Sequence, residues 1–195
     1  MLDLGATAAS SSLAAGIPAA RRAEKTFNLD YAPHAGMFAA HAGDNFIDQI
    51  KFMHDQGFRS IEDNGLMKRP VALQEEIGNT LAKLNMTMGV FVVDKGGNGA
   101  NTLAAGKKEY IDIFLNGCRQ AVEVAKRVNA KWATVVPGDF ERALPIGIQT
   151  GNVIEALRRG EEILEQNGLI MVLEPLRDNN NLFVRNSDQT YLICK

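Results

Sequence analysis

Each segment of this sequence that resembles a buried β-strand ends in a histidine or a carboxylate. In chain order these residues are His34, Glu62 with Asp63, Asp94, Asp139 and Glu174. The carboxyl ends of parallel strands meet at one edge of a sheet or one mouth of a barrel, so we expect these side chains to converge. Carboxylate oxygens and imidazole nitrogens suit a divalent cation and proton transfer. The alternative for each aspartate is a structural role as the N-cap of the next helix.

Glu174 is the strongest single candidate. It follows the apolar residues 171–173, and Pro175 after it interrupts the strand. An ionised carboxylate at the end of a buried strand must be paired or bound to a cation, because its burial alone is costly. We therefore predict that Glu174 is catalytic. His34 and Glu62 are predicted to contact the substrate, with a hydrogen-bonded structural role as the alternative for His34.

Two hydrophobic periodicities alternate along the chain and place these residues on secondary structure. Strands are expected at residues 26–34, 58–64, 86–94, 130–139 and 169–176. Helices are expected between Asp44 and Gly57, at 70–84, 107–129 and 149–167, and from Ser187 onward. The strands are almost continuously apolar, as in parallel strands buried on both faces. This order predicts an α/β fold, either an open doubly wound sheet or part of a (β/α)₈ TIM barrel.

Composition narrows the class of protein. The 195 residues are 46% hydrophobic and 23% charged, which fits a soluble globular domain. With 21 Lys and Arg against 23 Asp and Glu, no basic excess favours nucleic acid. The glycine-rich residues 95–101 do not form a dinucleotide-binding fingerprint, since Thr102 stands at the third glycine position, and they predict a flexible loop. No segment is apolar and long enough for a membrane span.

The N-terminal residues 1–24 differ from residues 25–195, which form the expected barrel domain. Residues 4–20 are small, uncharged and mildly apolar, like the second half of a twin-arginine export signal. The paired Arg21 and Arg22 lie on the wrong side of this run for such a signal. We expect a signal-like or disordered segment and a periplasmic or exported protein, with a cytoplasmic protein as the alternative.

Three segments carry a resemblance to a known family: NLDYAPHAGMF (28–38), GFRSIEDN (57–64) and, most specifically, MVLEPL (171–176). They resemble the hydroxypyruvate isomerase branch of the xylose-isomerase-like sugar isomerases and epimerases, a TIM-barrel superfamily related to endonuclease IV. The resemblance implies a divalent cation, Mg²⁺ or Mn²⁺, held by four ligands at the ends of strands 5 to 8. Glu174 matches the first ligand, and the other three would lie beyond Lys195.

The resemblance therefore implies a barrel truncated after its fifth strand. Its function would be metal-dependent isomerisation or epimerisation of a small sugar or hydroxy-keto acid through an enediolate, with activity of the 195-residue chain itself left open. The alternative is a non-catalytic sugar-binding or degenerate barrel protein without a complete metal site. An endonuclease IV-like phosphodiesterase is disfavoured by only three histidines and a net charge of −2. We expect open strand edges and a homo-oligomer.

Overall fold

The structure is a computed structural model that describes residues 27–177 and 179–195. The segment predicted to be signal-like, residues 1–24, lies outside the described residues, and so does the basis for predicting an exported location. Among the described helices, none has the length and apolar character needed to cross a membrane.

The described strands are short, and all of their pairings are parallel. Strand β1 pairs with β2, and β3, β4 and β5 form a three-stranded sheet in that order. Gly89 separates β2 from β3, and its N–H donates to the carbonyl of Ile61 at 2.7 Å, which links the two sheets. The strands are β1 (Ser60–Ile61), β2 (Thr87–Met88), β3 (Val90–Val92), β4 (Trp132–Val135) and β5 (Ile170–Leu173).

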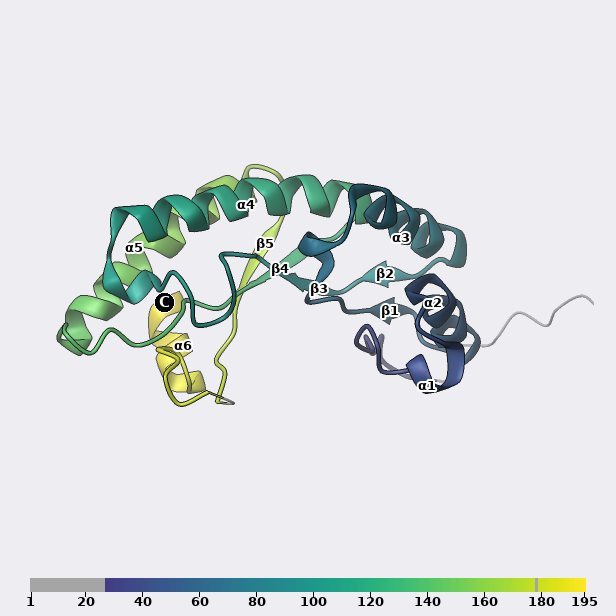
Figure 1. The fold of residues 1–195 in the computed structure, drawn as a ribbon, viewed down its shortest axis with the longest axis horizontal. Helices are drawn as coiled ribbons and strands as arrows, with labels where there is room; N and C mark the ends of the chain where they lie inside the picture. The colour runs from purple at the N-terminus through teal and green to yellow at the C-terminus, as the bar shows by residue number, and fades with distance from the viewer. Residues whose placement is uncertain (1–26, 178) are drawn as a thin grey trace, which may run out of the picture.

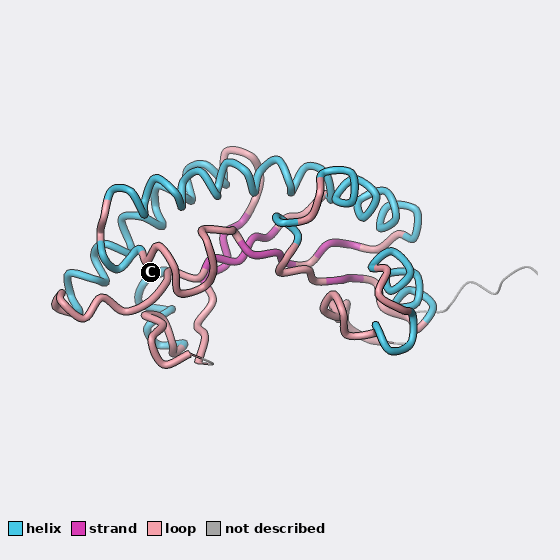
Figure 2. The backbone as a smooth tube through the Cα atoms, in the orientation of Figure 1, coloured by secondary structure: helices cyan, strands magenta, loops and turns pink. Residues whose placement is uncertain are grey.

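Helices alternate with these strands, as the apolar periodicity predicts. Figures 1 and 2 show the long helices α3, α4 and α5 on one side of the strands. The parallel α/β fold class is thereby confirmed, and the element order is that of successive β/α units. The helices are α1 (Ala39–Ala42), α2 (Phe46–Asp55), α3 (Val71–Leu84), α4 (Lys108–Val128), α5 (Ile146–Glu165) and α6 (Ser187–Cys194), with 3₁₀ turns η1 (Leu66–Lys68) and η2 (Leu103–Ala105).

The core lies between the sheet and this helical layer. Phe91 of β3 and Phe114 of α4 are completely buried. Gly160 of α5 faces the Phe114 ring, where an added Cβ would lie 2.7 Å from two ring carbons. At Gly78 of α3 an added Cβ would overlap the carbonyl oxygen of Arg127. These two glycines let α4 pack closely against its helical neighbours on both sides.

The strand predicted at residues 26–34 is wrong over most of its length. Only its end pairs, through an isolated parallel bridge between His34 and Glu62. Leu29 and Tyr31 are 63% and 54% exposed, so the alternation of apolar and polar residues does not build a ladder. The helix expected after Asp44 is α2, and its N-cap is Asn45, whose Oδ1 accepts from Ile47 N at 2.8 Å.

Candidate functional site

A cavity of about 260 Å³ lies at the carboxyl ends of β3, β4 and β5. Glu174 directly follows β5, and its N–H donates to the carbonyl of Val135, the last residue of β4, at 3.2 Å. This backbone bond sets Glu174 beside β4 at the mouth of the partial barrel, where its half-buried side chain lines the cavity. The polar lining residues are Asn64, Lys68, Asp94, Lys95, Asn98 and Glu174.

Asp94 is the second carboxylate in the cavity, and it already has partners. Its Oδ1 accepts from the N–H of Gly96 at 3.0 Å and lies 3.7 Å from Nζ of Lys68. Lys68 is 65% exposed, so this ion pair is a weak one. Asp94 therefore has a local structural role, because its bond to Gly96 turns the chain into the following loop. Asp94 also forms part of the cavity wall.

Lys95 is a buried cation that the sequence did not single out. It is 3% exposed, and its Nζ donates to the carbonyls of Gly97 and Asn98 at 3.2 Å and to that of Ala100. Burial lowers the pKa of Lys95 from 10.5 to about 8, against the opposing attraction of the Asp139 and Asp94 carboxylates. A lysine that titrates near neutrality in a cavity is a candidate for binding or chemistry.

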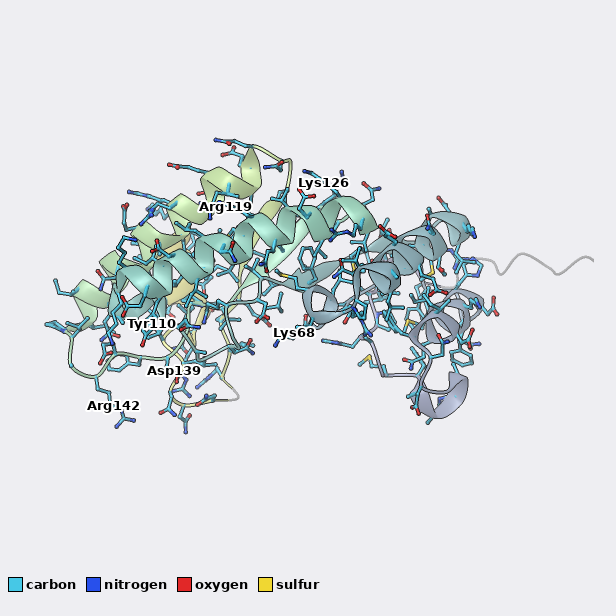
Figure 3. All side chains as sticks on the ribbon, turned by 45° about the horizontal axis from the view of Figure 1, so that its top comes forward. Lys68, Tyr110, Arg119, Lys126, Asp139 and Arg142 are labelled. Atoms are coloured by element: carbon cyan, nitrogen blue, oxygen red, sulfur yellow. The ribbon has the colours of Figure 1, made fainter. Side chains whose placement is uncertain are left out.

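Asp139 does not line the cavity that holds Glu174. Its backbone is tied to the glycine-rich loop, because its N–H donates to Gly99 at 3.0 Å and its carbonyl accepts from the Thr102 hydroxyl. Its Oδ1 is buried without a hydrogen-bond partner among the described residues. A Cβ on Gly99 would lie 2.5 Å from this oxygen, so a larger residue there would require the Asp139 side chain to move. Figure 3 labels Asp139, which follows β4, and Lys68 of η1, and both lie below α4 in that view.

His34 and Glu62, at the ends of the first two predicted strands, are brought together. Nε2 of His34 lies 3.2 Å from Oε1 of Glu62 and 3.2 Å from Nδ2 of Asn64. The side chains of His34 and Glu62 are 42% and 27% exposed and do not line the cavity, whereas Asn64 does. The pair therefore lies beside the cavity, joined to it through Asn64. Its substrate-binding role stays a prediction.

Asp63 is held by an ion pair with Arg69 and is not the N-cap that was the alternative for it, since the N-cap of the following 3₁₀ turn is Gly65. Its side chain is 2% exposed and lies 2.5 Å from Nε of Arg69, with the second oxygen 3.1 Å from the N–H of Gly65. Adjacent residues of an extended chain point to opposite sides. Glu62 therefore faces His34, while Asp63 faces Arg69. The ion pair between Asp63 and Arg69 fixes the turn that carries Asn64 and Lys68.

The described residues do not form a metal site by themselves. No three histidine, cysteine, aspartate or glutamate side chains of residues 27–177 and 179–195 come together closely enough to hold an ion. The histidines lie apart: His41 stacks on Phe52 at 5.7 Å between ring centroids, and Nδ1 of His54 lies 3.3 Å from Asp55. Glu174 is then a single candidate ligand, and the predicted Mg²⁺ or Mn²⁺ does not fit this set alone.

Comparisons with known proteins identify the fold. No protein-family model matches the sequence, and no curated protein matches it. The structure is similar to an AP endonuclease of family 2 from Brucella melitensis (TM-score 0.69, 18% identity, 84% of this chain and 62% of that one). It is also similar to L-ribulose 3-epimerase (TM-score 0.65, 14% identity, 83% and 55%) and to the IOLI protein with a zinc atom (TM-score 0.63, 12% identity, 84% and 58%).

At these identities the similarity shows the fold alone. The chain adopts the arrangement of a TIM barrel in partial form, which decides between the two architectures that the periodicity left open. It spans between 55% and 62% of the length of the three solved structures named above. The described strands belong to successive β/α units, in which β2 and β3 are separated only by Gly89 and share one unit.

Proposed function

We propose that this chain is part of a sugar isomerase or epimerase barrel and that Glu174 is its proton-transferring base. The observation that carries the proposal is the position of Glu174: it lines a polar cavity at the carboxyl ends of three adjacent parallel strands. Active sites of TIM barrels lie at this end. Solved structures of the same fold include an L-ribulose 3-epimerase and a D-psicose 3-epimerase.

The proposed chemistry is proton transfer next to a carbonyl group. The carboxylate of Glu174 removes a hydrogen from the carbon α to the carbonyl, and the electron pair moves onto the carbonyl oxygen to give an enediolate. An ammonium group in the cavity wall, that of Lys68, stabilises negative charge on oxygen. The hydroxyl proton passes through solvent from its own oxygen to the former carbonyl oxygen, and return of the abstracted proton to the neighbouring carbon completes an isomerisation.

The proposed substrate is hydroxypyruvate or a short ketose, which rests on the sequence resemblance around Glu174. A divalent cation, Mg²⁺ or Mn²⁺, belongs to the proposal only if ligands outside the described residues join Glu174. When bound, such a cation stabilises charge on the two enediolate oxygens.

Hydrogen exchange tests the proposal, because it requires one base only. The 195-residue chain is incubated with hydroxypyruvate in D₂O, and ¹H NMR follows the loss of the hydrogens on C3, which lie α to the carbonyl. We expect exchange above the protein-free rate, and a loss of at least about tenfold in Glu174→Gln, since acid/base groups contribute about 10²–10⁴-fold. The control is Glu155→Gln, an exposed glutamate on α5.

The alternative is a sugar-binding protein without catalysis, which the lack of a three-residue metal cluster in the described part favours. Saturable binding of a ketose or hydroxypyruvate with no exchange above the protein-free rate would support this alternative. Equal exchange in the Glu174 and Glu155 variants would show that Glu174 is not the base.

A further inference from the structure

The glycine-rich loop of residues 95–101 wraps around the ammonium group of Lys95. Nζ of Lys95 donates to the carbonyl oxygens of Gly97 and Asn98, at 3.2 Å in both bonds, and to that of Ala100. An ammonium group has three hydrogens to donate. The three carbonyls of the loop therefore use the whole hydrogen-bonding capacity of Lys95.

The loop has little else to hold it in one conformation. Its sequence, KGGNGAN, contains no large apolar side chain. Gly96, Gly97, Asn98 and Ala100 are exposed, whereas Lys95 is 3% exposed. The φ angles of Gly96 and Gly97 are 99° and 113°, and ordering a glycine costs more conformational freedom than ordering any other residue. Bonds to the buried ammonium group thus replace the apolar contacts that order other segments.

Both ends of the loop are bonded to residues that follow strands. At its start the N–H of Gly96 donates to Oδ1 of Asp94 at 3.0 Å. Toward its end the carbonyl of Gly99 accepts from the N–H of Asp139 at 3.0 Å. The two carbonyls between these points are the ones that Lys95 binds at 3.2 Å. The middle of the loop is therefore fixed by Lys95 rather than by its ends.

The middle of the loop is also the part that forms the cavity wall. Gly97 and Asn98 line the cavity together with Glu174. These are two of the residues whose carbonyls bind Lys95. Groups that meet a ligand must be held in place by the residues behind them, because small displacements of a binding wall weaken binding.

We propose that Lys95 is a positioning residue, whose ammonium group fixes Gly97 and Asn98 as the wall of the cavity against which the ligand lies. Lys95 does not act as an acid or a base, since none of its three hydrogens is left for a substrate. The ligand is that of the proposed function, hydroxypyruvate or a short ketose, so the binding part of this proposal rests on that function. The fixing of the loop does not.

The charges around Lys95 favour its ammonium form, whereas burial opposes it. The carboxylates of Asp139 and Asp94 attract the ammonium group, and burial lowers the pKa of Lys95 to about 8. Glu174 and Lys68 are the other charged residues that line the same cavity. A neutral amine has only two hydrogens to donate, so one carbonyl loses its bond when Lys95 is deprotonated. The loop should therefore be more mobile at pH 9.5 than at pH 6.5.

The test measures the mobility of the loop by ¹³C relaxation at the glycine Cα atoms, whose hydrogens do not exchange with solvent at high pH. Order parameters of Gly97 and Gly99 are compared with that of Gly151 on α5 in the wild type, Lys95→Met and Lys68→Met. Lys68→Met is the matched control, because it removes the other ammonium group of the cavity. In Lys95→Met we expect the two loop values to fall from about 0.85 to below about 0.6. Lys68→Met and Gly151 should show no change.

The wild type at pH 6.5 and pH 9.5 gives a second measurement that does not depend on how well a variant folds. The order parameters of Gly97 and Gly99 should fall at pH 9.5 in the wild type, and pH should have no effect on them in Lys95→Met. Equal loop mobility in the wild type and Lys95→Met overturns the proposal. An equal loss of order at Gly151 overturns it as well, because Lys95 would then support the whole fold rather than the loop.

Deuterium exchange of hydroxypyruvate separates positioning from chemistry. Lys95→Met should raise KM about threefold to tenfold, as expected when one hydrogen bond to the ligand is no longer formed. The maximal rate should change less, because the proposed base, Glu174, follows β5 and lies outside the loop. If the wild type exchanges no hydrogen, the proposed function fails, whereas the relaxation data still decide whether Lys95 holds the loop. A loss of maximal rate with an unchanged KM would make Lys95 an acid/base group and overturn its assignment as a positioning residue.

Discussion

The ion pair between Asp63 and Arg69 should contribute much more to stability than a surface pair of the same length. Asp63→Asn preserves the shape of the side chain and removes its charge. The Asp63–Arg69 pair has an N···O distance of 2.5 Å, with side chains that are 2% and 26% exposed. The pair of Lys108 and Asp112 on α4 has the same 2.5 Å distance, but its side chains are 87% and 50% exposed. The two pairs therefore differ chiefly in burial.

Burial sets the magnitude of the expected effect. Removing one partner of a fully buried pair costs about 3–5 kcal/mol, because the other charge stays buried. Arg69 is partly exposed and stacks over Phe46 at 4.6 Å, so water still reaches its guanidinium. We expect Asp63→Asn to lower the free energy of unfolding by about 2–3 kcal/mol. For a chain of this length each kcal/mol corresponds to about 2–4 °C in Tm.

The assay is urea unfolding, read by circular dichroism, of a double-substitution cycle at each pair. For the buried pair the cycle combines Asp63→Asn with Arg69→Met, and for the surface pair Asp112→Asn with Lys108→Met. We expect the surface pair to couple by less than about 1 kcal/mol. Equal coupling energies in the two cycles would refute the reasoning that burial makes the Asp63–Arg69 pair strong. They would also mean that this pair does not hold the turn that carries Asn64 and Lys68.

Two further predictions concern packing and charge. Gly78→Ala should destabilise the protein by about 1–2 kcal/mol, because overlap of the new Cβ with the Arg127 carbonyl outweighs the gain in helix propensity. At Gly151 an added Cβ meets no atom within 4 Å, so Gly151→Ala should stabilise the protein by about 0.5–1 kcal/mol. Thermal melts of both variants check this, and shifts in the same direction would contradict it. The pKa of Lys95 in the folded protein is about 8, below the ordinary 10.5. Between pH 8 and pH 10.5 the lysine is therefore protonated in the unfolded chain and neutral in the folded protein. The free energy of unfolding rises with pH in this range, by at most about 1.4 kcal/mol per pH unit. Urea unfolding measures this at pH 7 and pH 9.5: the free energy of unfolding of the wild type should rise by about 2 kcal/mol relative to that of Lys95→Met. If the difference between the two proteins is the same at both pH values, the ammonium group of Lys95 is well solvated.

The long elements follow from the sequence because their apolar periodicity is continuous. The helix predicted at 70–84 is found as Val71–Leu84, and that at 107–129 as Lys108–Val128. The strand at 26–34 fails because alternation alone does not supply a partner: only its end pairs, through the isolated bridge between His34 and Glu62. A strand needs a neighbour along its whole length, and that neighbour is not encoded locally.

The composition of the site was less predictable than its location. Every strand end carries a charged or imidazole group, but the side to which each one turns depends on register. Glu62 and Asp63 are adjacent, and only pairing with the chain at His34 decides that Glu62 faces it. Lys95 was missed because its neighbours suggest a flexible loop, whereas its ammonium group binds three carbonyls of that loop.

The fate of the carboxylates bears on the kind of proton transfer that this chain can support. Asp63 is bound to Arg69, and Asp139 faces the glycine-rich loop, which leaves Asp94 and Glu174 as the carboxylates that line the cavity. Asp94 is held by Gly96 and Lys68. Inverting one carbon requires a second group on the opposite face of the enediolate, whereas moving a proton between neighbouring carbons on one face requires a single base. With Glu174 as that base, the described residues support exchange and same-face isomerisation better than epimerisation.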